Sequence, residues 1–583
     1  MILVYDTEVF KYDWMLVAVD LMTHEETVII NDSQKLKEFY ESHKNYIWVG
    51  FNSRNYDTWI IKSILKGYNP HDMSKWIIQG DRKGWEYDRS LSKIQHYDYD
   101  SRWSNVVPGL KTLEAFMGDD IRETEVSFDL DRPLSEEELQ QTLKYCRHDV
   151  NETMKVFAHA RDEFNAHFSL IKEFGLELAT VSKTNAQLTA LILNAQRTER
   201  TDEWDFDLEE PCKLVKKYKH VVDWFRDPEN RNLKARFETD VAGIPITYAW
   251  GGCHGAIPNY FASGNFVHCD VNSYYPSLMI EWGLLSRNCR TPEKFKEIYD
   301  KRLALKRAGK KAEQAPFKVI LNSTYGASGD KNNALFDPRQ AHRVCANGQI
   351  FLTLLIEMME GVAEAFNVNT DGVFFNVKDL SKLDDYYRIC KEWEQITRMG
   401  LGHDKYTRVW QRDVNNYIIE LENGELEQKG AVVKNTSVLD NDLPIVNKAV
   451  VNWFVRGVPP EKTIQDCKDL QEFQKVFKLS IKYKYAMQGC TFDKVKGKKV
   501  WKGDGVVLND KSYRVFASIE PTGAVYKKKD GKNPEKFANC PDNCFIENDS
   551  VAGVSTDVYP QLNKQWYIDT TWYRIRQFKG EVK

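Results

Sequence analysis

One stretch limits what this chain can fold into more than any other, residues 266–278. The apolar run 266–269 is predicted to form a strand that ends on a carboxylate, Asp270. A polar turn follows, and a helix-like segment begins at Leu278. This order places Asp270 at a strand terminus, where a side chain can face a cleft instead of a core. Acids at strand ends are usually turn or cap residues. Asp270 therefore indicates a catalytic site only if other segments supply further functional side chains.

Composition sets broad bounds on the protein. A chain of 583 residues has room for about three to four domains, and 42% apolar with 28% charged residues is ordinary for a soluble globular protein. The net charge of −4 does not exclude a nucleic-acid enzyme, which needs only a local basic groove. We expect no membrane span and no secretory signal. Eleven scattered cysteines fit a reducing cytoplasm, and the spacing of Cys540 and Cys544, without a second pair, does not favour zinc.

Three acids near the start of the chain could share a metal site. Asp6 and Glu8 lie two residues apart in a predicted strand, so they point to the same face. Asp57 follows a second predicted strand, 46–51, and the loop that begins at Asn52. Paired carboxylate oxygens suit a divalent cation. An isolated pair of acids at this spacing more often marks an exposed strand end. The interpretation as a metal site therefore depends on later segments.

A helix further along supplies the remaining groups. Ser135 and Glu138 form a capping-box pattern at its start, and Tyr145 and Asp149 lie one turn apart on one face. Four carboxylates and a tyrosine are what a phosphodiesterase with two metal ions needs, since the metals bridge the scissile phosphate and activate water.

These three segments, in this order, resemble the DnaQ-like 3′–5′ proofreading exonucleases attached to B-family DNA polymerases. The family patterns DxE, Nx₂₋₃(F/Y)D and YxxxD are all intact, and residues 109–114 look like the stretch that precedes the third. The resemblance implies a twisted mixed sheet flanked by helices, and a site that binds two Mg²⁺ or Mn²⁺ ions. The implied catalytic residues are Asp6, Glu8, Asp57, Tyr145 and Asp149, the four acids being the metal ligands, with Asn52 binding substrate.

A cationic helical region follows Asp270. Residues 295–311 have a helical pattern, and Lys318, Asn322 and Tyr325 then recur at i, i+4 and i+7, which puts them on one face. A lysine supplies charge to a triphosphate, and an aromatic ring can stack on a base pair.

A second acidic position lies in a predicted hairpin over residues 367–375. Apolar residues flank a polar centre that contains Asp371. A long helix is predicted before it, over about residues 346–365.

Three of these segments resemble motifs of B-family DNA polymerases. Residues 270–277 are similar to DxxSLYPS with Tyr274 in place of leucine, residues 318–326 match KxxxNSxYG at every fixed position, and residues 369–371 match DTD except that Asn369 replaces the first acid. The resemblance implies two further Mg²⁺ or Mn²⁺ ions held by Asp270, Asp371 and the Val271 carbonyl, the two acids being catalytic. It implies nucleotide contacts by Tyr275, Arg302, Lys306, Lys318, Asn322 and Tyr325, with Tyr275 selecting deoxynucleotides.

Weaker matches occur on either side of this core. Residues 415–417 resemble a KxY primer-gripping segment in which Asn415 replaces lysine, so only Tyr417 is carried over. Residues 248–252 resemble the Y-x-G-G template loop of protein-primed phage polymerases with one extra residue; a simple turn is the alternative. Residues 475–532 carry 15 Lys or Arg against 5 Asp or Glu, interleaved with aromatics, which suits a duplex-holding thumb or an ordinary basic surface.

The expected architecture is a multidomain α/β and α+β protein, an RNase H-like exonuclease domain followed by a right-hand polymerase. The expected parts are an exonuclease domain (1–165), a connector with the template loop (166–260), palm (261–297), fingers (298–327), palm again (328–430), and a thumb with the C-terminal region (431–583).

We therefore expect a DNA-directed DNA polymerase with a proofreading exonuclease, in replication of a phage or mobile element in a bacterial cytoplasm. Its expected partners are primer-template DNA, dNTPs and, as candidates, replication accessory proteins. The intervals 270–318 and 326–369 lack room for the insertions of protein-primed enzymes, so we expect ordinary primer extension instead of terminal-protein priming. Two alternatives stay open: an exonuclease whose polymerase half only binds DNA, and a replication factor without enzymatic activity.

Overall fold

The computed structural model describes residues 1–102, 108–495 and 497–582, and no helix among them is long and apolar enough to span a membrane. The chain divides into two compact units. Unit 1 consists of Met1–Lys183, Thr436–Val446 and Glu461–Asp569, and unit 2 of Thr184–Asn435, Asn447–Pro460 and Thr570–Lys583.

Unit 1 contains a five-stranded mixed sheet in the order β3-β2-β1-β4-β5. The central strand β1 pairs antiparallel with β2 and parallel with β4. Tyr5 and Trp48, both fully buried, meet edge to face with ring centroids 5.2 Å apart in the core. The sheet agrees with the mixed sheet expected for this region. The strands are β1 (Ile2–Val9), β2 (Trp14–Asp20), β3 (Glu26–Ile30), β4 (Ile47–Gly50) and β5 (Tyr97–Asp100).

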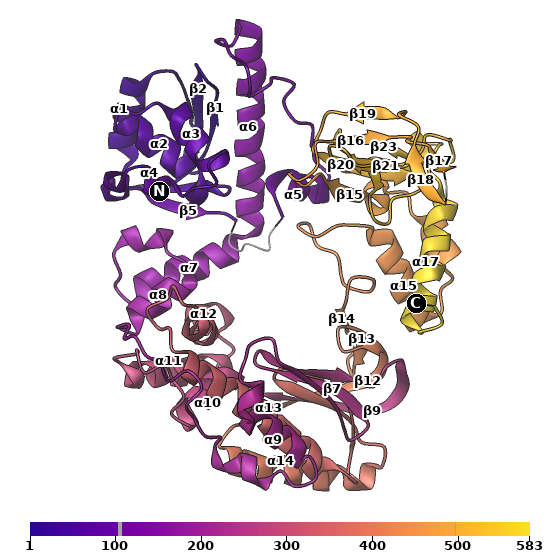
Figure 1. Cartoon of the computed structure of the whole chain (residues 1–583). Helices are drawn as coiled ribbons and strands as arrows, with labels where there is room; N and C mark the ends of the chain where they lie inside the picture. Colours follow the sequence, from indigo (N-terminus) through magenta and orange to yellow (C-terminus); the bar gives the residue numbers. More distant parts are fainter. Residues whose placement is uncertain (103–107, 496, 583) are drawn as a thin grey trace. The chain divides into compact units, whose positions relative to one another are not determined.

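The long helix α6 (Glu136–His159) runs beside β1 and β2 (Figure 1). The capping box at its start is present: the Glu138 amide donates to Ser135 Oγ at 3.2 Å, and the Ser135 amide donates to Glu138 Oε2 at 2.8 Å. The capping box fixes where the helix begins. It therefore also fixes where Tyr145 and Asp149 lie along the neighbouring sheet. The other helices here are α1 (Ser33–His43), α2 (Asp57–Leu65), α3 (Pro70–Ile78), α4 (Gly84–Tyr87), α5 (Leu110–Met117) and α7 (Arg161–Glu173).

The later residues of unit 1 form small sheets of short strands, ordered β15-β20-β23, β19-β16-β21-β22 and β17-β18. Arg514 of β20, one of the basic residues of the predicted thumb, is fully buried. Its guanidinium donates to the carbonyls of Asp119 at 2.6 Å and Asp549 at 2.7 Å. It therefore joins these strands to the segment after α5 and is not part of a DNA-facing surface. The elements are α16 (Pro460–Asp466), β15 (Lys475–Lys478), β16 (Tyr485–Gln488), β17 (Phe492–Val495), β18 (Lys498–Trp501), β19 (Val506–Leu508), β20 (Ser512–Ala517), β21 (Val525–Lys528), β22 (Glu535–Lys536) and β23 (Cys544–Ile546).

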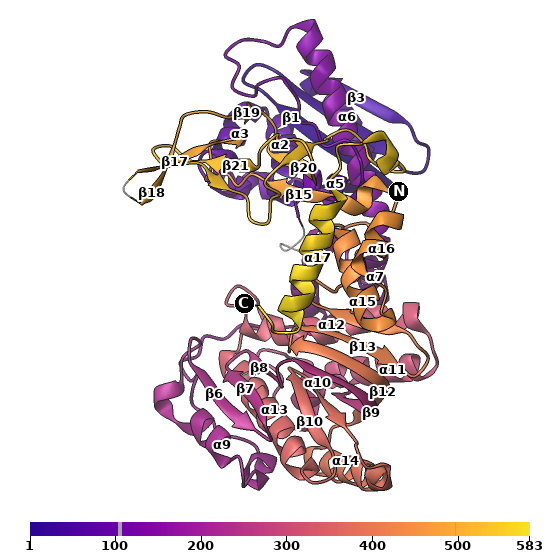
Figure 2. The ribbon, with the colours of Figure 1, turned by 90° about the vertical axis from the view of Figure 1, so that its right-hand side faces the viewer.

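Unit 2 is built on a nine-stranded antiparallel sheet, β14-β13-β12-β9-β11-β10-β8-β7-β6. Strand β9 lies between β12 and β11, and β9, β12 and β13 run side by side in Figure 2. The buried rings of Phe266, Phe366 and Phe374 form its core. The strands are β6 (Arg236–Val241), β7 (Ile244–Ala249), β8 (Gly252–Ala256), β9 (Tyr260–Val271), β10 (Glu364–Asn369), β11 (Gly372–Asn376), β12 (Leu401–Asp413), β13 (Asn416–Leu421) and β14 (Leu426–Lys429).

The helix α13 (Pro338–Met359) is buried along most of its length. The predicted helix over 346–365 was wrong at both ends. Proline is tolerated in the first turn, so the helix begins at Pro338, and residues from Glu364 onward belong to strand β10. The other helices with residues in unit 2 are α8 (Asn185–Ile192), α9 (Lys219–Arg226), α10 (Tyr274–Glu281), α11 (Pro292–Arg307), α12 (Lys311–Gly329), α14 (Leu383–Thr397), α15 (Pro444–Arg456) and α17 (Lys564–Phe578).

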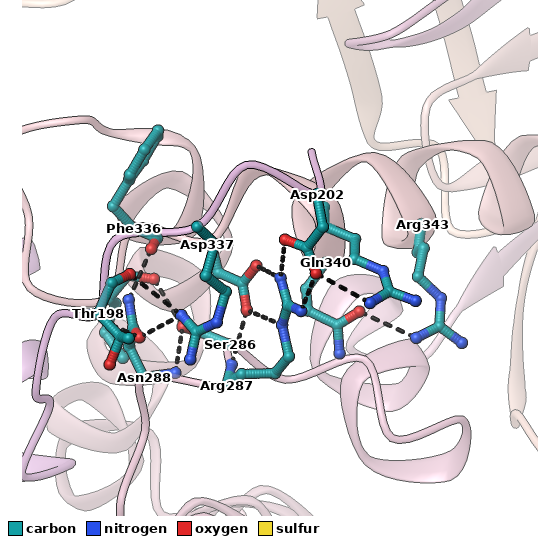
Figure 3. A network of polar contacts seen from close by, with 12 residues as sticks. Thr198, Asp202, Ser286, Arg287, Asn288, Phe336, Asp337, Gln340 and Arg343 are labelled. Atoms are coloured by element: carbon teal, nitrogen blue, oxygen red, sulfur yellow. Dashed lines mark hydrogen bonds and ion pairs between the residues drawn. The ribbon is translucent and has the colours of Figure 1, made fainter. Parts of the chain in front are cut away.

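An ion-pair network fastens the start of α13 to two distant segments (Figure 3). Arg287 donates to Asp337 through Nε at 2.9 Å and through Nη2 at 2.7 Å. The same guanidinium donates to Asp202 at 2.5 Å, and Arg339 reaches Asp202 at 3.1 Å. The Asp337 side chain is fully buried, so Arg287 supplies its counter-charge.

Candidate active sites

The first candidate site lies in unit 1, where four acids predicted from the sequence come together. Asp6 and Glu8 come from β1, Asp57 is the first residue of α2, and Asp149 lies on α6. Oxygens of Asp6 and Glu8 and the Cys146 sulfur lie within 4.8 Å of one another. Asp57 Oδ1 accepts hydrogen bonds from the Thr7 amide at 3.2 Å and the Thr7 hydroxyl at 2.5 Å, which fixes this carboxylate against β1.

Burial raises the pKa of each acid in this cluster. Burial is the largest cause for Asp6 and Glu8, and the neighbouring carboxylates add to it. Burial also raises the pKa of Asp57 to about 7 and that of Asp149 above its ordinary value. Such a concentration of buried negative charge fits a site for divalent cations with oxygen ligands.

Lys111 of α5 is a member of this cluster that motif reasoning did not assign. Its Nζ lies 2.9 Å from Asp149 Oδ1, 3.1 Å from Glu114 Oε2 and 4.7 Å from the centre of the Tyr145 ring. Burial lowers its pKa, but the ion pairs with Asp149 and Glu114 outweigh burial and the net pKa is raised. Lysine therefore stays charged here. The only sequence signal was its place in residues 109–114, because 38 residues separate Lys111 from Asp149.

Tyr145 lines a pocket of about 310 Å³ with residues from the segment before α6. Burial, then the charges of Asp149 and Glu8, raise the pKa of its hydroxyl, so it is a neutral donor at physiological pH. Asn52 has a left-handed backbone with φ of 62°, held by a 2.8 Å hydrogen bond from its amide to Asp100 Oδ1. It lies in the loop that leads from β4 towards Asp57.

The second candidate site lies in unit 2, at the end of β9. Asp270 pairs with Gly372 of β11 and with Gly402 of β12, so it occupies the middle of the sheet. Asp371 lies in the turn between β10 and β11, and its carbonyl accepts a 3.0 Å hydrogen bond from the Val271 amide. This contact brings together the two acids predicted from the sequence, with the Val271 backbone between them.

The electrostatics of this pair parallel those of the first site. Burial, then the charges of Asp371 and Asp404, raise the pKa of Asp270 to about 7, and Lys306 opposes them. Burial also raises the pKa of Asp371, while Lys429 opposes the shift. Sequence reasoning missed Asp404 and Lys429 because sheet pairing alone brings β12 and β14 into this neighbourhood.

Asn369, which stands where the motif has an acid, is held by a neighbour. Its Oδ1 lies 3.1 Å from His254 Nδ1, its cross-strand partner on β8. Thr370, in the turn that follows, has a positive φ of 56° and donates its amide to the Cys253 carbonyl at 3.1 Å. The side-chain amide of Asn369 is neutral. Asp270 and Asp371 therefore supply the negative charge at the motif positions.

The tyrosines of two motifs stack on each other beside this pair. The rings of Tyr275 on α10 and Tyr325 on α12 have centroids 3.9 Å apart and an interplanar angle of 10°. The two rings therefore cover each other, and they would have to separate before either could stack on a sugar or a base.

The cationic residues of these motifs lie on α11 and α12. Lys306, Lys318 and Asn322 are exposed, the last two on the same face of α12 as Tyr325. Arg302 of α11 donates to Ser273 Oγ, in the turn that follows Asp270. Its Nε is buried and has no hydrogen-bond partner among the described residues.

Two other tyrosines from the predicted DNA-contacting segments, Tyr417 and Tyr248, are buried. Tyr417 is 5% exposed, with its hydroxyl 3.4 Å from Glu427 Oε1. Tyr248 is buried, with its hydroxyl 2.9 Å from Thr353 Oγ1, whereas Gly251 beside it is exposed. Both tyrosines pack in the sheet core in this structure.

The chain matches no protein-family model and no curated protein in sequence. Among solved structures it is similar to the family B DNA polymerase from the hyperthermophilic archaeon Pyrobaculum calidifontis, with a TM-score of 0.43 and 14% sequence identity. The match covers 100% of this chain and 78% of that one.

Proposed function

We propose that this protein is a DNA-directed DNA polymerase that extends a primer 3′-hydroxyl with dNTPs and removes mispaired ends with a 3′–5′ exonuclease. The observation that carries the proposal is the convergence of Asp270 and Asp371 beside the stacked rings of Tyr275 and Tyr325. These residues come from three motif segments that resemble those of B-family polymerases. The origin in a phage or mobile element stays a prediction.

The residues of both sites fit divalent metal ions. Each site concentrates carboxylates whose pKa values are raised by burial and mutual repulsion, so a bound cation would relieve an unfavourable charge. Asp270, Asp371 and the Val271 carbonyl would hold ions in one site, and Asp6, Glu8, Asp57 and Asp149 in the other. Bound Mg²⁺ or Mn²⁺ would supply activation of the attacking oxygen and neutralisation of charge on the phosphate.

The remaining residues of unit 2 would position the nucleotide. Lys318 and Lys306, both exposed, supply positive charge for the triphosphate, and Arg302 of α11 adds to it. The stacked pair opens so that Tyr325 covers the new base pair and Tyr275 lies under the sugar, where its ring excludes a 2′-hydroxyl. Each of these roles follows the motif position of its residue and the face on which it lies.

In unit 1, Tyr145 would orient the attacking water through its neutral hydroxyl. Lys111 holds Asp149 in place, and its charge opposes the rise in the pKa of this acid that burial causes. An ionised Asp149 is required because a protonated carboxyl is a poor metal ligand.

Primer extension on an annealed oligonucleotide, with dNTPs and Mg²⁺, tests the proposal. Asp371→Asn should reduce incorporation at least about hundredfold, while Asp57→Asn should abolish primer degradation and leave incorporation intact. Asp330→Asn, an exposed acid in the turn after α12, is the control and should change neither activity. Degradation without any incorporation by the unmodified protein would favour the alternative of an exonuclease with a DNA-binding half. Absence of both activities would favour the non-enzymatic factor.

A further inference from the structure

Three side chains that can bind a soft metal ion converge in unit 2, and none of them belongs to either candidate site. The sulfurs of Cys269 and Cys390 and a ring nitrogen of His403 all lie within 4.8 Å of one another. Cys269 immediately precedes Asp270 in β9, and successive side chains of a strand point to opposite faces. The cluster therefore lies on the sheet face opposite to the acid.

The fold brings these ligands from three separate elements. Cys269 and His403 are direct cross-strand partners in the pairing of β9 with β12. Cys390 lies on α14, near the Tyr386 hydroxyl, which is 3.3 Å from His403 Nδ1 and adjacent to both sulfurs. Cys269 and Cys390 are 0% and 2% exposed, and His403 is half-buried. The site is thus enclosed, with one ligand nearer the surface.

The spacing suits a tetrahedral ion. Zn²⁺ binds thiolate sulfur at about 2.3 Å and imidazole nitrogen at about 2.0 Å, which places ligand atoms about 3.5–3.8 Å from one another. The three atoms here lie within 4.8 Å of one another, so they would have to close by at most about 1.3 Å. The Tyr386 hydroxyl is positioned to complete the shell, directly or through a water.

We propose that Cys269, Cys390 and His403 bind a structural Zn²⁺ ion. Two thiolates and an imidazole favour zinc over the Mg²⁺ or Mn²⁺ expected at the carboxylate sites. The ion would join α14 to β9 and β12 directly behind Asp270, and so restrain the strand end that carries this acid. The site is independent of the proposed polymerase activity.

Another cysteine pair provides a comparison within the chain. Cys540 and Cys544 are both buried and lie next to each other, but they belong to no metal-ligand cluster among the described residues. A pair of thiols alone is too few ligands for a structural zinc site, which takes four. The histidine at the Cys269–Cys390 pair is what distinguishes it.

Titration with Co²⁺ tests the proposal, because thiolate ligands give cobalt a charge-transfer absorption in the near ultraviolet that carboxylates do not give. The full chain, reduced and stripped of metal, should develop this absorption, and Zn²⁺ should abolish it. Cys390→Ser should remove the absorption and weaken Zn²⁺ binding at least about tenfold.

Two further variants separate ligation from a folding defect. His403→Gln changes the half-buried ligand and should weaken Zn²⁺ binding while the circular dichroism spectrum stays unchanged. Cys289→Ser alters a buried cysteine of the same unit whose sulfur contacts the Leu193 carbonyl, and it should leave the absorption intact. Unmodified protein that shows no thiolate absorption with Co²⁺, or a Cys269–Cys390 disulfide that forms whether or not Zn²⁺ is supplied, would overturn the proposal.

Discussion

Lys111→Met is the substitution that most directly tests the electrostatic account of the unit 1 site. Methionine keeps an unbranched apolar chain and removes the ammonium that lies 2.9 Å from Asp149 Oδ1. A hydrogen bond to a charged group contributes about 1.5–3 kcal/mol, and 1.36 kcal/mol corresponds to one pKa unit. The pKa of Asp149, already raised by burial, should therefore rise further when this charge is removed.

The sign of the effect on the proposed exonuclease activity follows from metal binding. Only the ionised carboxylate is a good ligand, so a higher pKa moves the acidic limb of the pH–rate profile to higher pH. We expect this limb to shift upward by about 1–2 units in single-turnover degradation of labelled single-stranded DNA at fixed Mg²⁺, measured from about pH 6 to pH 9. At the alkaline end of this range the variant should degrade DNA at most of the rate of the unmodified protein.

Two controls accompany this measurement. Lys44→Met removes another lysine of unit 1, which pairs with Glu41 at the surface with 44% of its side chain exposed, and it should not move the profile. Primer extension, assigned to unit 2, should be unaffected by Lys111→Met. An unshifted profile with uniformly lower activity would refute the reasoning, because Lys111 would then act on packing and not on the ionisation of Asp149.

Three other outcomes are expected. Arg287→Ala removes the counter-charge of the buried Asp337 and should lower the free energy of unfolding by about 3–5 kcal/mol. The loss should be seen as increased hydrogen exchange in residues 198–209. Arg388, whose side chain is 64% exposed, is the control, and Arg388→Ala should lower the free energy of unfolding by less than about 1 kcal/mol. The raised pKa of Asp270 means that the folded state binds its proton more tightly, so stability falls as pH rises from about 4 through about 7. In EDTA, Asp270→Asn should therefore raise the melting temperature by about 2–4 °C more at pH 8 than near pH 5; equal shifts at both would contradict this. Tyr275→Val should increase ribonucleotide incorporation about 10- to 200-fold in competition assays, and no change would remove its proposed selectivity.

The local parts of both sites could be predicted from the sequence because they depend on short-range periodicity. The two-residue period of a strand puts Asp6 and Glu8 on one face, and the helical period does the same for Lys318, Asn322 and Tyr325. The capping box at Ser135 was predicted for the same reason, since its hydrogen bonds span three residues. Helix boundaries were less certain, as α13 shows, because a proline can begin a helix as well as end one.

What the tertiary structure alone decided is which distant residues meet. Lys111 reaches Asp149, and Lys429 influences Asp371, through packing and strand order that no local pattern encodes. The nine-stranded order of the unit 2 sheet, in which β9 lies between β11 and β12, places Asp270 beside the β10–β11 turn on one side and pairs Cys269 with His403 on the other. Sequence determined the chemistry that each segment carries. Long-range pairing determined which of these groups share a site, because contacts between distant residues follow from burial of whole sheet and helix faces and not from neighbours in the chain.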